Sequence, residues 1–462
     1  MPTMFFKFRE SIGKINVRGT NKGMKLRTKI RSRVMGFMAS DFKRDSLRVL
    51  ARTRRQLAGK RPHVLYFHQA DDPYSHLVVQ RFAELQDSYD LQWRPHLVSA
   101  PLQSFQGDAS RFKDWALVDA MSVARDYGTQ FPAQAQLPRT DVVAEANRQL
   151  AECIGSMTFA GQAEETGRKL WSGELKAGPD KVAEDANAND VTRGAIQKGN
   201  QLRRAKGHYL GAMFYFEGEW YWGLDRLYLL EERLRSLGFR KDSAEMCVPR
   251  PEAVSVNGLD ASSVSLEYFL SLRSPYTAVG HQRVMDLVRR SGVKLILRPV
   301  MPMMMRGIPA PREKQLYIIS DSKRESDAAG VRFGNFIDPF GEPVKRAFSL
   351  YPWVNRQGKA EAYVTAYLSA AWAEGIDICS DQGLRQVIES IGLSWEEALG
   401  QFDNDEWGPL LQDNVESMLT NNLWGVPSFR VSGGNGATSY ACWGQDRIWR
   451  VESEITRRVT PL

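Results

Sequence analysis

Cysteine is scarce in this sequence, and long apolar runs are missing from it. The 462 residues include four cysteines, none of which forms a C-x-x-C pair. This spacing gives no support for a disulfide scaffold, a zinc ribbon or a dithiol redox centre. No segment approaches the roughly 18 consecutive apolar residues of a membrane-spanning helix. We therefore expect a globular protein of about two to four domains.

Histidine is also rare, with six residues in the whole chain. Five of them lie before residue 210, and no pair has the H-x-x-x-H spacing of a helical metal site. The sequence therefore predicts no metal site and no metal cofactor.

Acidic residues are nearly absent from the first 60 positions. This segment holds 17 lysines and arginines against three acids, whereas the remainder holds 45 against 51. The basic pI near 9.2 therefore originates in the N-terminal extension. The mildly acidic body gives no electrostatic reason to expect nucleic-acid binding.

The N-terminal extension, residues 1–58, predicts a basic amphipathic helix from about residue 34 to residue 57. Five apolar side chains lie roughly on one side of this helix: Val34, Met38, Phe42, Val49 and Leu50. Such a helix can lie on an anionic membrane surface. A solvated arm packed on the acidic body, an organellar transit peptide and a nucleic-acid contact remain open as alternatives.

An internal repeat organises the rest of the chain. VLYFHQADDPYS at 64–75 matches LEYFLSLRSPYT at 266–277, an offset of 202 residues. An Arg-Pro pair follows in each copy at an offset of 204, and a Trp-Gly-x-Asp-Arg segment at an offset of 221. The order strand, helix, strand, helical stretch, hairpin and helix is that of a thioredoxin fold with a helical insertion.

This layout predicts an α/β protein made of two tandem thioredoxin-like domains. We expect the first domain at 59–240 and the second at 263–462. Residues 241–262, which contain two prolines and many small or polar residues, are interpreted as the linker between them.

The junction Ser274-Pro275-Tyr276 has the strongest chemical signal. Proline is favoured in the first turn of a helix, so Ser274 should lie at the helix N-terminus, where backbone N–H groups favour an anion. A serine hydroxyl there can donate a hydrogen bond to a thiolate and lower its pKa. The alternative is that Ser274 is only an N-cap.

Two later segments add to this signal. Trp424-Gly425-Val426-Pro427 is typical of a cis-proline loop, in which Val426 can pair with an extended peptide. Gln445 and Asp446 follow a glycine turn and suit the zwitterionic end of a small peptide. Locally, a trans Pro427 and an N-capping Asp446 beside a surface ion pair of Arg447 remain the alternatives.

Together these motifs resemble the glutathione-dependent branch of the DsbA-like thioredoxin superfamily. The kappa-class glutathione transferases and the 2-hydroxychromene-2-carboxylate isomerases form this branch. The resemblance rests on YFLSLRSPYTAVG, the LRP strand end, PREKQLYIISD, FGEPV, WAEGIDI, WGVPSF and WGQDR, and covers nearly all of residues 264–456.

The resemblance implies a glutathione site in the second copy. Ser274 would hold the thiolate, with Pro275 and Tyr276 beside it. Val426 and Pro427 would bind the cysteinyl backbone, and Gln445 and Asp446 the γ-glutamyl end. The family's Gly-Asn loop corresponds to residues 301–311, which contain no asparagine, and Arg306 is the substitute that this loop offers.

The first copy departs from this pattern. Asp72 stands at the position of Ser274 and Ala212 at the position of Pro427. An ionised carboxylate would repel a thiolate, and alanine does not readily adopt a cis bond. We therefore interpret the first copy as degenerate for glutathione chemistry. Asp72 and His76, four residues apart, are expected to form a simple surface pair, and a catalytic dyad is the alternative.

Three functions remain to be weighed. The sequence favours a glutathione-dependent isomerase or transferase acting on a hydrophobic, aromatic electrophile, with glutathione as co-substrate. A dithiol oxidoreductase needs a cysteine at position 72, 75, 274 or 277, and these residues are Asp, Ser, Ser and Thr. The remaining alternative is a non-catalytic tandem scaffold that binds a peptide or protein partner.

Expectations about partners and location follow from the same features. The substrate should be a small hydrophobic molecule, and the body should bind no nucleic acid. We expect a cytoplasmic protein whose basic arm can touch a membrane surface; a homodimer is an open alternative.

Overall fold

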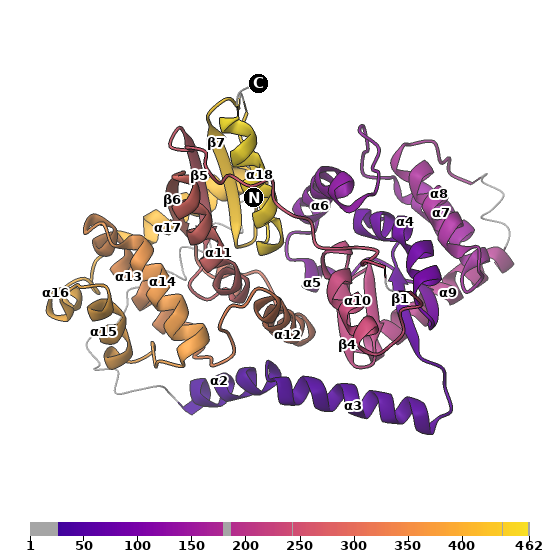
Figure 1. The fold of residues 1–462 in the computed structure, drawn as a ribbon, viewed down its shortest axis with the longest axis horizontal. Helices are drawn as coiled ribbons and strands as arrows, with labels where there is room; N and C mark the ends of the chain where they lie inside the picture. Colours follow the sequence, from indigo (N-terminus) through magenta and orange to yellow (C-terminus); the bar gives the residue numbers. More distant parts are fainter. Residues whose placement is uncertain (1–25, 179–185, 243, 437, 461–462) are drawn as a thin grey trace. The chain divides into compact units, whose positions relative to one another are not determined.

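The computed structural model describes residues 26–178, 186–242, 244–436 and 438–460. By its internal contacts the chain divides into two units (Figure 1). The C-terminal unit contains most of residues 252–462 and the described part of the arm up to Lys43. The N-terminal unit contains residues 44–251 and the short segment 311–317.

The N-terminal unit is built on a four-stranded sheet of order β2-β1-β3-β4. Strands β1 and β2 are parallel, and the other two neighbouring pairs are antiparallel. Its strands are β1 (His63–His68), β2 (Gln92–Leu97), β3 (Met213–Phe216) and β4 (Glu219–Trp222). Its helices of eight or more residues are α4 (Pro73–Ser88), α6 (Ala109–Val123), α7 (Thr140–Cys153), α8 (Phe159–Trp171), α9 (Ala186–Ala205) and α10 (Leu227–Ser236), and the short helix α5 spans Gln103–Gln106.

The C-terminal unit repeats this order of strands, as β6-β5-β7-β8 with the same directions. Its strands are β5 (Val264–Leu270), β6 (Lys294–Pro299), β7 (Ser428–Gly433) and β8 (Tyr440–Trp443). Its helices are α11 (Pro275–Ser291), α12 (Arg312–Ala328), α13 (Glu342–Arg356), α14 (Ala360–Ser369), α15 (Asp381–Ser390), α16 (Trp395–Leu399), α17 (Trp407–Thr420) and α18 (Ile448–Val459). Helices α15 and α16 lie at the end of this unit that is away from the sheet (Figure 1).

Strands β1 and β5 are buried on both faces, which explains why most of their residues are apolar. In β1, Leu65 and Phe67 pack on one side with Met213 and Trp220. Tyr66 points to the other side and stacks on Phe214 with ring centroids 4.8 Å apart. The expected elements around β1, α4, β5 and α11 are therefore confirmed to within a residue or two.

The Arg-Pro match between the two copies is not a structural equivalence. Tyr66 pairs with Pro95, whereas Tyr268 pairs with Leu297, so the second strands align at the offset of 202 residues. The second Arg-Pro pair therefore lies two residues further along its strand. A shift of two keeps each side chain on the same face of a sheet, so the local sequence tolerates it.

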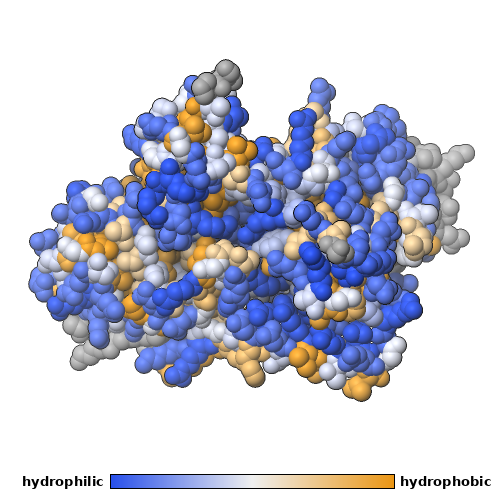
Figure 2. Space-filling model, in the orientation of Figure 1, coloured by the Kyte–Doolittle hydropathy of each residue, from blue (hydrophilic) through white to orange (hydrophobic). Residues whose placement is uncertain are grey.

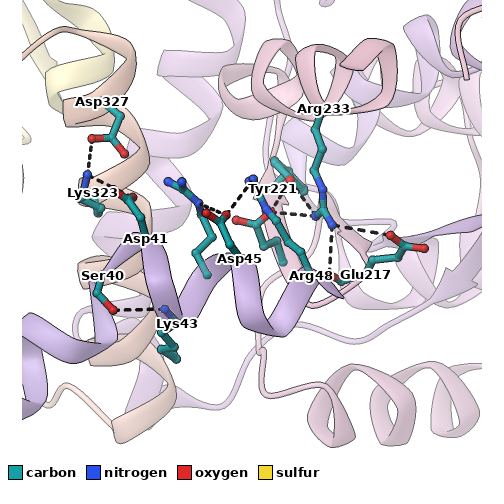
Figure 3. Close-up of polar contacts among 12 residues, drawn as sticks. Ser40, Asp41, Lys43, Asp45, Arg48, Glu217, Tyr221, Arg233, Lys323 and Asp327 are labelled. Atoms are coloured by element: carbon teal, nitrogen blue, oxygen red, sulfur yellow. Dashed lines mark hydrogen bonds and ion pairs between the residues drawn. The ribbon is translucent and has the colours of Figure 1, made fainter. Parts of the chain in front are cut away.

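The arm forms two helices, α2 (Leu26–Met38) and α3 (Asp41–Leu57), where one was expected. The chain turns at Ala39 and Ser40, and the Ser40 hydroxyl accepts a hydrogen bond from the Lys43 backbone N–H (Figure 3). The expected single apolar side is also wrong in part, because Met38 packs against the core of the C-terminal unit.

The expected linker is attached to the two units for part of its length. Glu231 of α10, which is fully buried, accepts hydrogen bonds from the backbone N–H groups of Cys247 and Val248. Glu452 of α18 accepts one from the N–H of Val256. The two carboxylates accept hydrogen bonds from backbone N–H groups that are buried here. In an extended linker these N–H groups would be hydrated instead.

Candidate functional site

Ser274 lies at the N-terminus of α11, as its position before Pro275 predicts. Its side chain accepts a hydrogen bond from the Thr277 backbone N–H at 3.2 Å, and Pro275 occupies the first turn. The residue is half-buried. Its hydroxyl therefore sits at the positive end of a 17-residue helix.

The cis-proline loop meets this hydroxyl. The Val426–Pro427 bond is cis, as expected, and it is the one cis peptide bond among the described residues. The bond before Ala212 is accordingly trans. The Ser274 hydroxyl donates to the Val426 carbonyl oxygen at 3.4 Å, so the tertiary fold brings together two motifs that lie 152 residues apart.

Gly425 allows the loop to pass close to Trp443. A Cβ atom at position 425 would lie 2.4 Å from the Trp443 ring. The Gly444 N–H donates to the Pro427 carbonyl oxygen at 2.9 Å. The Trp-Gly-Gln-Asp-Arg segment is thereby hydrogen-bonded to the cis-proline loop.

The Tyr276 hydroxyl forms a hydrogen bond within the C-terminal unit. Its hydroxyl donates to a carboxylate oxygen of Asp321 at 2.8 Å, and Arg324 donates to the other oxygen at 2.8 Å. Asp321 is buried in α12. This arrangement orients Tyr276 beside Ser274 and connects the helical insertion to the loop.

Gln445 and Asp446 differ in their access to a ligand. Gln445 is 1% exposed, and its amide NH2 donates to Glu325 at 2.9 Å while its carbonyl oxygen accepts from Arg283. Asp446 is half-buried and contacts the Gln445 amide. Arg447 is buried, so the surface ion pair considered for it is wrong.

The sequence did not predict one ion pair beside Ser274. Arg273 donates through Nε and Nη2 to the buried carboxylate of Asp338, at 2.6 and 3.0 Å. Arg31 of α2 donates to the same carboxylate at 3.1 Å. Asp338 lies in an irregular segment 65 residues from Arg273, and no local pattern marks it.

The methionine run at 301–305 has two environments. Met301 is fully buried in the core, whereas Met304 is half-buried with its sulfur 3.8 Å from Nη1 of Arg273. Arg306 ends the 3-10 turn η4 (Met303–Arg306) and donates through Nη2 to the Trp424 carbonyl oxygen at 3.0 Å. It therefore contacts the segment that leads into the cis-proline loop.

Asp72 caps α4 in the N-terminal unit at the position equivalent to Ser274. Its carboxylate accepts hydrogen bonds from the Ser75 N–H at 3.0 Å, the Ser75 hydroxyl at 2.7 Å and the Tyr74 N–H at 3.4 Å. The Ser75 hydroxyl also accepts from the Ala212 N–H at 3.0 Å. The anion-binding helix end is therefore filled by the protein's own carboxylate.

A pocket opens beside Asp72. Its empty volume is about 480 Å³, part of which is open to solvent. The residues that line it include Asp71, Asp72, Tyr74, Lys113 and Trp222. This pocket combines aromatic side chains with two neighbouring carboxylates, an environment opposed to a thiolate.

The surface pair of Asp72 and His76 is not formed. His76 is buried, its ring stands edge-on to Phe131, and its Nε2 lies 3.4 Å from the Gln80 amide. Burial lowers the pKa of His76 to about 4. His76 lies one turn after Asp72 on α4, as the spacing predicts, but this face of α4 packs against α8.

We expect Asp72 to make the N-terminal unit less stable as the pH rises. Burial raises the pKa of Asp72 to about 6, above its usual value near 4. Protonated Asp72 stabilises the folded unit fully below about pH 4. This stabilisation, on the order of 1 to 2 kcal/mol, is lost as the pH rises through about 6. Urea unfolding at a series of pH values measures this change. Asp72→Asn should remove the dependence, and an unchanged pH profile in that variant would contradict the assignment.

The described residues provide no thiol pair at either helix end. All four cysteines are free, and three of them are buried. No three His, Cys, Asp or Glu side chains in the described ranges gather into a metal-binding group. No helix in the described part of the chain has the length and apolar character needed to cross a bilayer.

The C-terminal unit contains a domain of the DsbA-like thioredoxin class. Residues 265–456 match the family model described as the DSBA-like thioredoxin domain. No curated protein matches the chain.

Solved structures of this class are similar to part of the chain. A 2-hydroxychromene-2-carboxylate isomerase is 19% identical over 42% of this chain and 95% of its own, with a TM-score of 0.36. The cytosolic disulfide reductase DsbM from Pseudomonas aeruginosa, in a structure with GSH, is 17% identical over 42% of this chain and 99% of its own, with a TM-score of 0.33. A probable DsbA oxidoreductase from Streptomyces coelicolor is 17% identical over 43% and 92%, with a TM-score of 0.34.

Proposed function

We propose that the C-terminal unit is a glutathione-dependent isomerase or transferase that acts on a hydrophobic, aromatic electrophile. One observation carries this proposal: the Ser274 hydroxyl lies at a helix N-terminus, within 3.4 Å of the carbonyl oxygen that precedes a cis-proline. A thiolate bound there would receive a hydroxyl donor and the helix dipole together. Ser274 would exchange its bond to Val426 for one to the sulfur.

The chemistry follows from a positioned thiolate. The sulfur attacks a carbon of a conjugated double bond, a C–S bond forms, and the π electrons move onto the conjugated carbonyl oxygen. Rotation about the resulting single bond and expulsion of the thiolate give cis–trans isomerisation. Protonation of the carbanion with the C–S bond retained gives a conjugate.

The other residues would bind glutathione. Val426 would offer its backbone to the cysteinyl unit, and the half-buried Asp446 would receive the γ-glutamyl ammonium group. Gln445 is nearly inaccessible, so we assign it the positioning of Asp446 rather than a direct contact.

We expect Ser274→Ala to raise the pKa of the bound glutathione thiol by about one to two units. The reason is the loss of one charge-assisted donor, which costs roughly 1.5–3 kcal/mol of thiolate stabilisation. The measurement is a titration of thiolate absorbance in the glutathione complex, with Asp72→Ala as the control. An unchanged pKa in Ser274→Ala would refute the assignment, and a large effect of Asp72→Ala would move the site to the N-terminal unit.

A non-catalytic scaffold is the second candidate function, because no serine, threonine or cysteine lines the pocket beside Asp72. Retention of the intact chain on immobilised glutathione separates the two. Retention that is lost in Ser274→Ala supports the enzyme, and no retention of the wild type supports the scaffold.

We further propose that the two units arose by tandem duplication, with domains at 59–240 and 263–462. Two pairs of equivalent hydrogen bonds support this. Tyr74 donates to Asp119 at 2.7 Å just as Tyr276 donates to Asp321, at the same offset of 202 residues. Glu231 and Glu452, at the offset of 221, both accept from backbone N–H groups of the linker.

A further inference from the structure

Arg306 is a buried cation without a counter-anion. It is 6% exposed, and among the described residues its guanidinium donates one hydrogen bond, from Nη2 to the Trp424 carbonyl oxygen. Its buried Nε has no hydrogen-bond partner. No acidic side chain of the described residues forms an ion pair with it.

Other enclosed arginines of this unit are paired with carboxylates. Arg324 is bonded to Asp321 and Arg346 to Asp381. In the N-terminal unit, Arg203 is equally buried and has no carboxylate, but it donates to three oxygens. Arg306 has one acceptor for its five N–H donors, and a buried, unpaired charge is costly.

Arg306 contacts the same loop as Ser274. Its one acceptor, the Trp424 carbonyl oxygen, lies two residues before Val426, whose own carbonyl accepts from Ser274. Burial without a counter-anion lowers the pKa of Arg306 to about 10, which still leaves it a cation at neutral pH.

We propose that Arg306 binds the carboxylate of a ligand held at Ser274. The inference rests on the proposed function. A guanidinium presents parallel N–H groups that match a carboxylate, which makes this the chemical class that the unused donors fit. Two sources are compatible with it: the glycine carboxylate of glutathione, or a carboxylate on the aromatic substrate. Because Arg306 is nearly enclosed, the η4 turn must open for the ligand to reach it.

Calorimetric binding to wild type, Arg306→Met and Arg306→Lys tests the proposal. The probes are glutathione, its glycine ethyl ester, cinnamate and cinnamamide. We expect Arg306→Met to weaken one carboxylate probe at least about tenfold and to leave its ester or amide partner unchanged. The probe that responds identifies the source. Arg306→Lys should recover part of the affinity.

Thermal unfolding without ligand supplies a second test with a matched control. Removing an unpaired buried charge should leave the Tm of Arg306→Met unchanged or raised, whereas Arg324→Met removes the guanidinium partner of the buried Asp321 carboxylate and should lower it. If Arg306→Met binds all four probes like the wild type, the inference is overturned. If wild type binds no glutathione and Ser274→Ala is silent, the proposed function fails, and the cinnamate pair still decides the anion site.

An independent observation concerns the arm. Helix α2 is attached to the C-terminal unit by one face. The Ser32 hydroxyl accepts from the Asp338 N–H at 3.1 Å, Arg31 pairs with the Asp338 carboxylate, and Met35 and Ala39 pack against the core. These contacts determine which side of α2 faces outward.

The outward side of α2 is apolar. Four large side chains spaced four, four and three residues apart are each more than half exposed: Leu26, Ile30, Val34 and Phe37. The exposed Lys29 and Arg33 flank them. Figure 2 shows apolar residues among hydrophilic ones where Figure 1 draws α2.

Helix α3 has the same polarity. Arg48 and Arg55 donate to Glu219 and Glu217, each at 2.8 Å, and Arg233 also donates to Glu219. Figure 3 shows Arg48, Arg233 and Glu217 of this cluster. On the other side Phe42, Val49 and Leu57 are between 64% and 85% exposed. Each helix therefore leaves most of its large apolar side chains in water, the reverse of an ordinary surface helix.

We propose that the apolar outward side of α2 binds an anionic lipid bilayer surface, and that the apolar side of α3 does so as well. Apolar side chains with flanking lysine and arginine are the composition of interfacial helices, and the exposed Lys29 and Arg33 beside the apolar side chains of α2 complement anionic headgroups. A nucleic acid would leave the apolar groups of this side unexplained.

Flotation of the full chain with phosphatidylserine–phosphatidylcholine vesicles tests this, with pure phosphatidylcholine as the reference. We expect Ile30→Ser/Val34→Ser to reduce vesicle binding about tenfold, and Lys29→Glu/Arg33→Glu to reduce it only on anionic vesicles. Val118→Ser/Val191→Ser, equally exposed in the other unit, is the matched control and should bind normally. Unchanged binding in both arm variants, or loss of dimers or RNA binding instead of vesicle binding, would overturn the proposal.

Discussion

Glu231→Ala should lower the free energy of unfolding of the N-terminal unit by about 3–5 kcal/mol. The carboxylate is fully buried and accepts from the N–H groups of Cys247 and Val248 at 2.7 and 2.8 Å, and from the Tyr89 hydroxyl at 2.7 Å. Its removal leaves three buried donors without an acceptor. Urea unfolding followed by tryptophan fluorescence measures the change.

The neighbouring residue supplies the control. Glu232 is exposed on the same helix, so Glu232→Ala should change stability by no more than about 0.5 kcal/mol. A loss below about 1 kcal/mol in Glu231→Ala would mean that the linker contributes little to the stability of this unit.

Gly199→Ala should destabilise the same unit by about 3 kcal/mol or more. A Cβ atom at this position of α9 would lie 1.9 Å from the Leu97 carbonyl oxygen and 2.9 Å from its carbon. These are backbone atoms of β2, so no side chain can rotate away. Either α9 or the strand must move.

A second glycine in the same helix separates crowding from helix propensity. Gly194 has nothing within 4 Å of its would-be Cβ, so Gly194→Ala should stabilise the unit by about 0.5–1 kcal/mol. Equal effects of the two substitutions in thermal unfolding would show that α9 does not pack on β2 as closely as described.

Local patterns were sufficient wherever the physical cause is local. Continuous apolar runs bounded by turns predicted β1 and β5, and a proline in the first turn predicted the start of α4 and α11. The cis bond before Pro427 was also anticipated, from the resemblance of its motif. In each case the residues that decide the conformation are neighbours in the chain.

The arm shows where local reasoning stopped. Its amphipathic pattern predicted a helix, but not the turn at Ser40 or which side would face the protein. Ion pairs of Arg48 and Arg55 with glutamates more than 150 residues away oriented α3, and those partners have no signature in the local sequence. Sequence patterning alone would have buried the apolar side.

The sequence by itself determined the repeat, the strand and helix order and the residue types at both helix ends, because these depend on short-range periodicity and spacing. Only the tertiary structure decided what those residues contact. It placed the Ser274 hydroxyl on the Val426 carbonyl, enclosed Gln445, buried Arg306 without a carboxylate and turned His76 inward. Contacts between distant segments depend on how helices pack on the sheet, and desolvation arises only in that packing, so neither can be read from spacing along the chain.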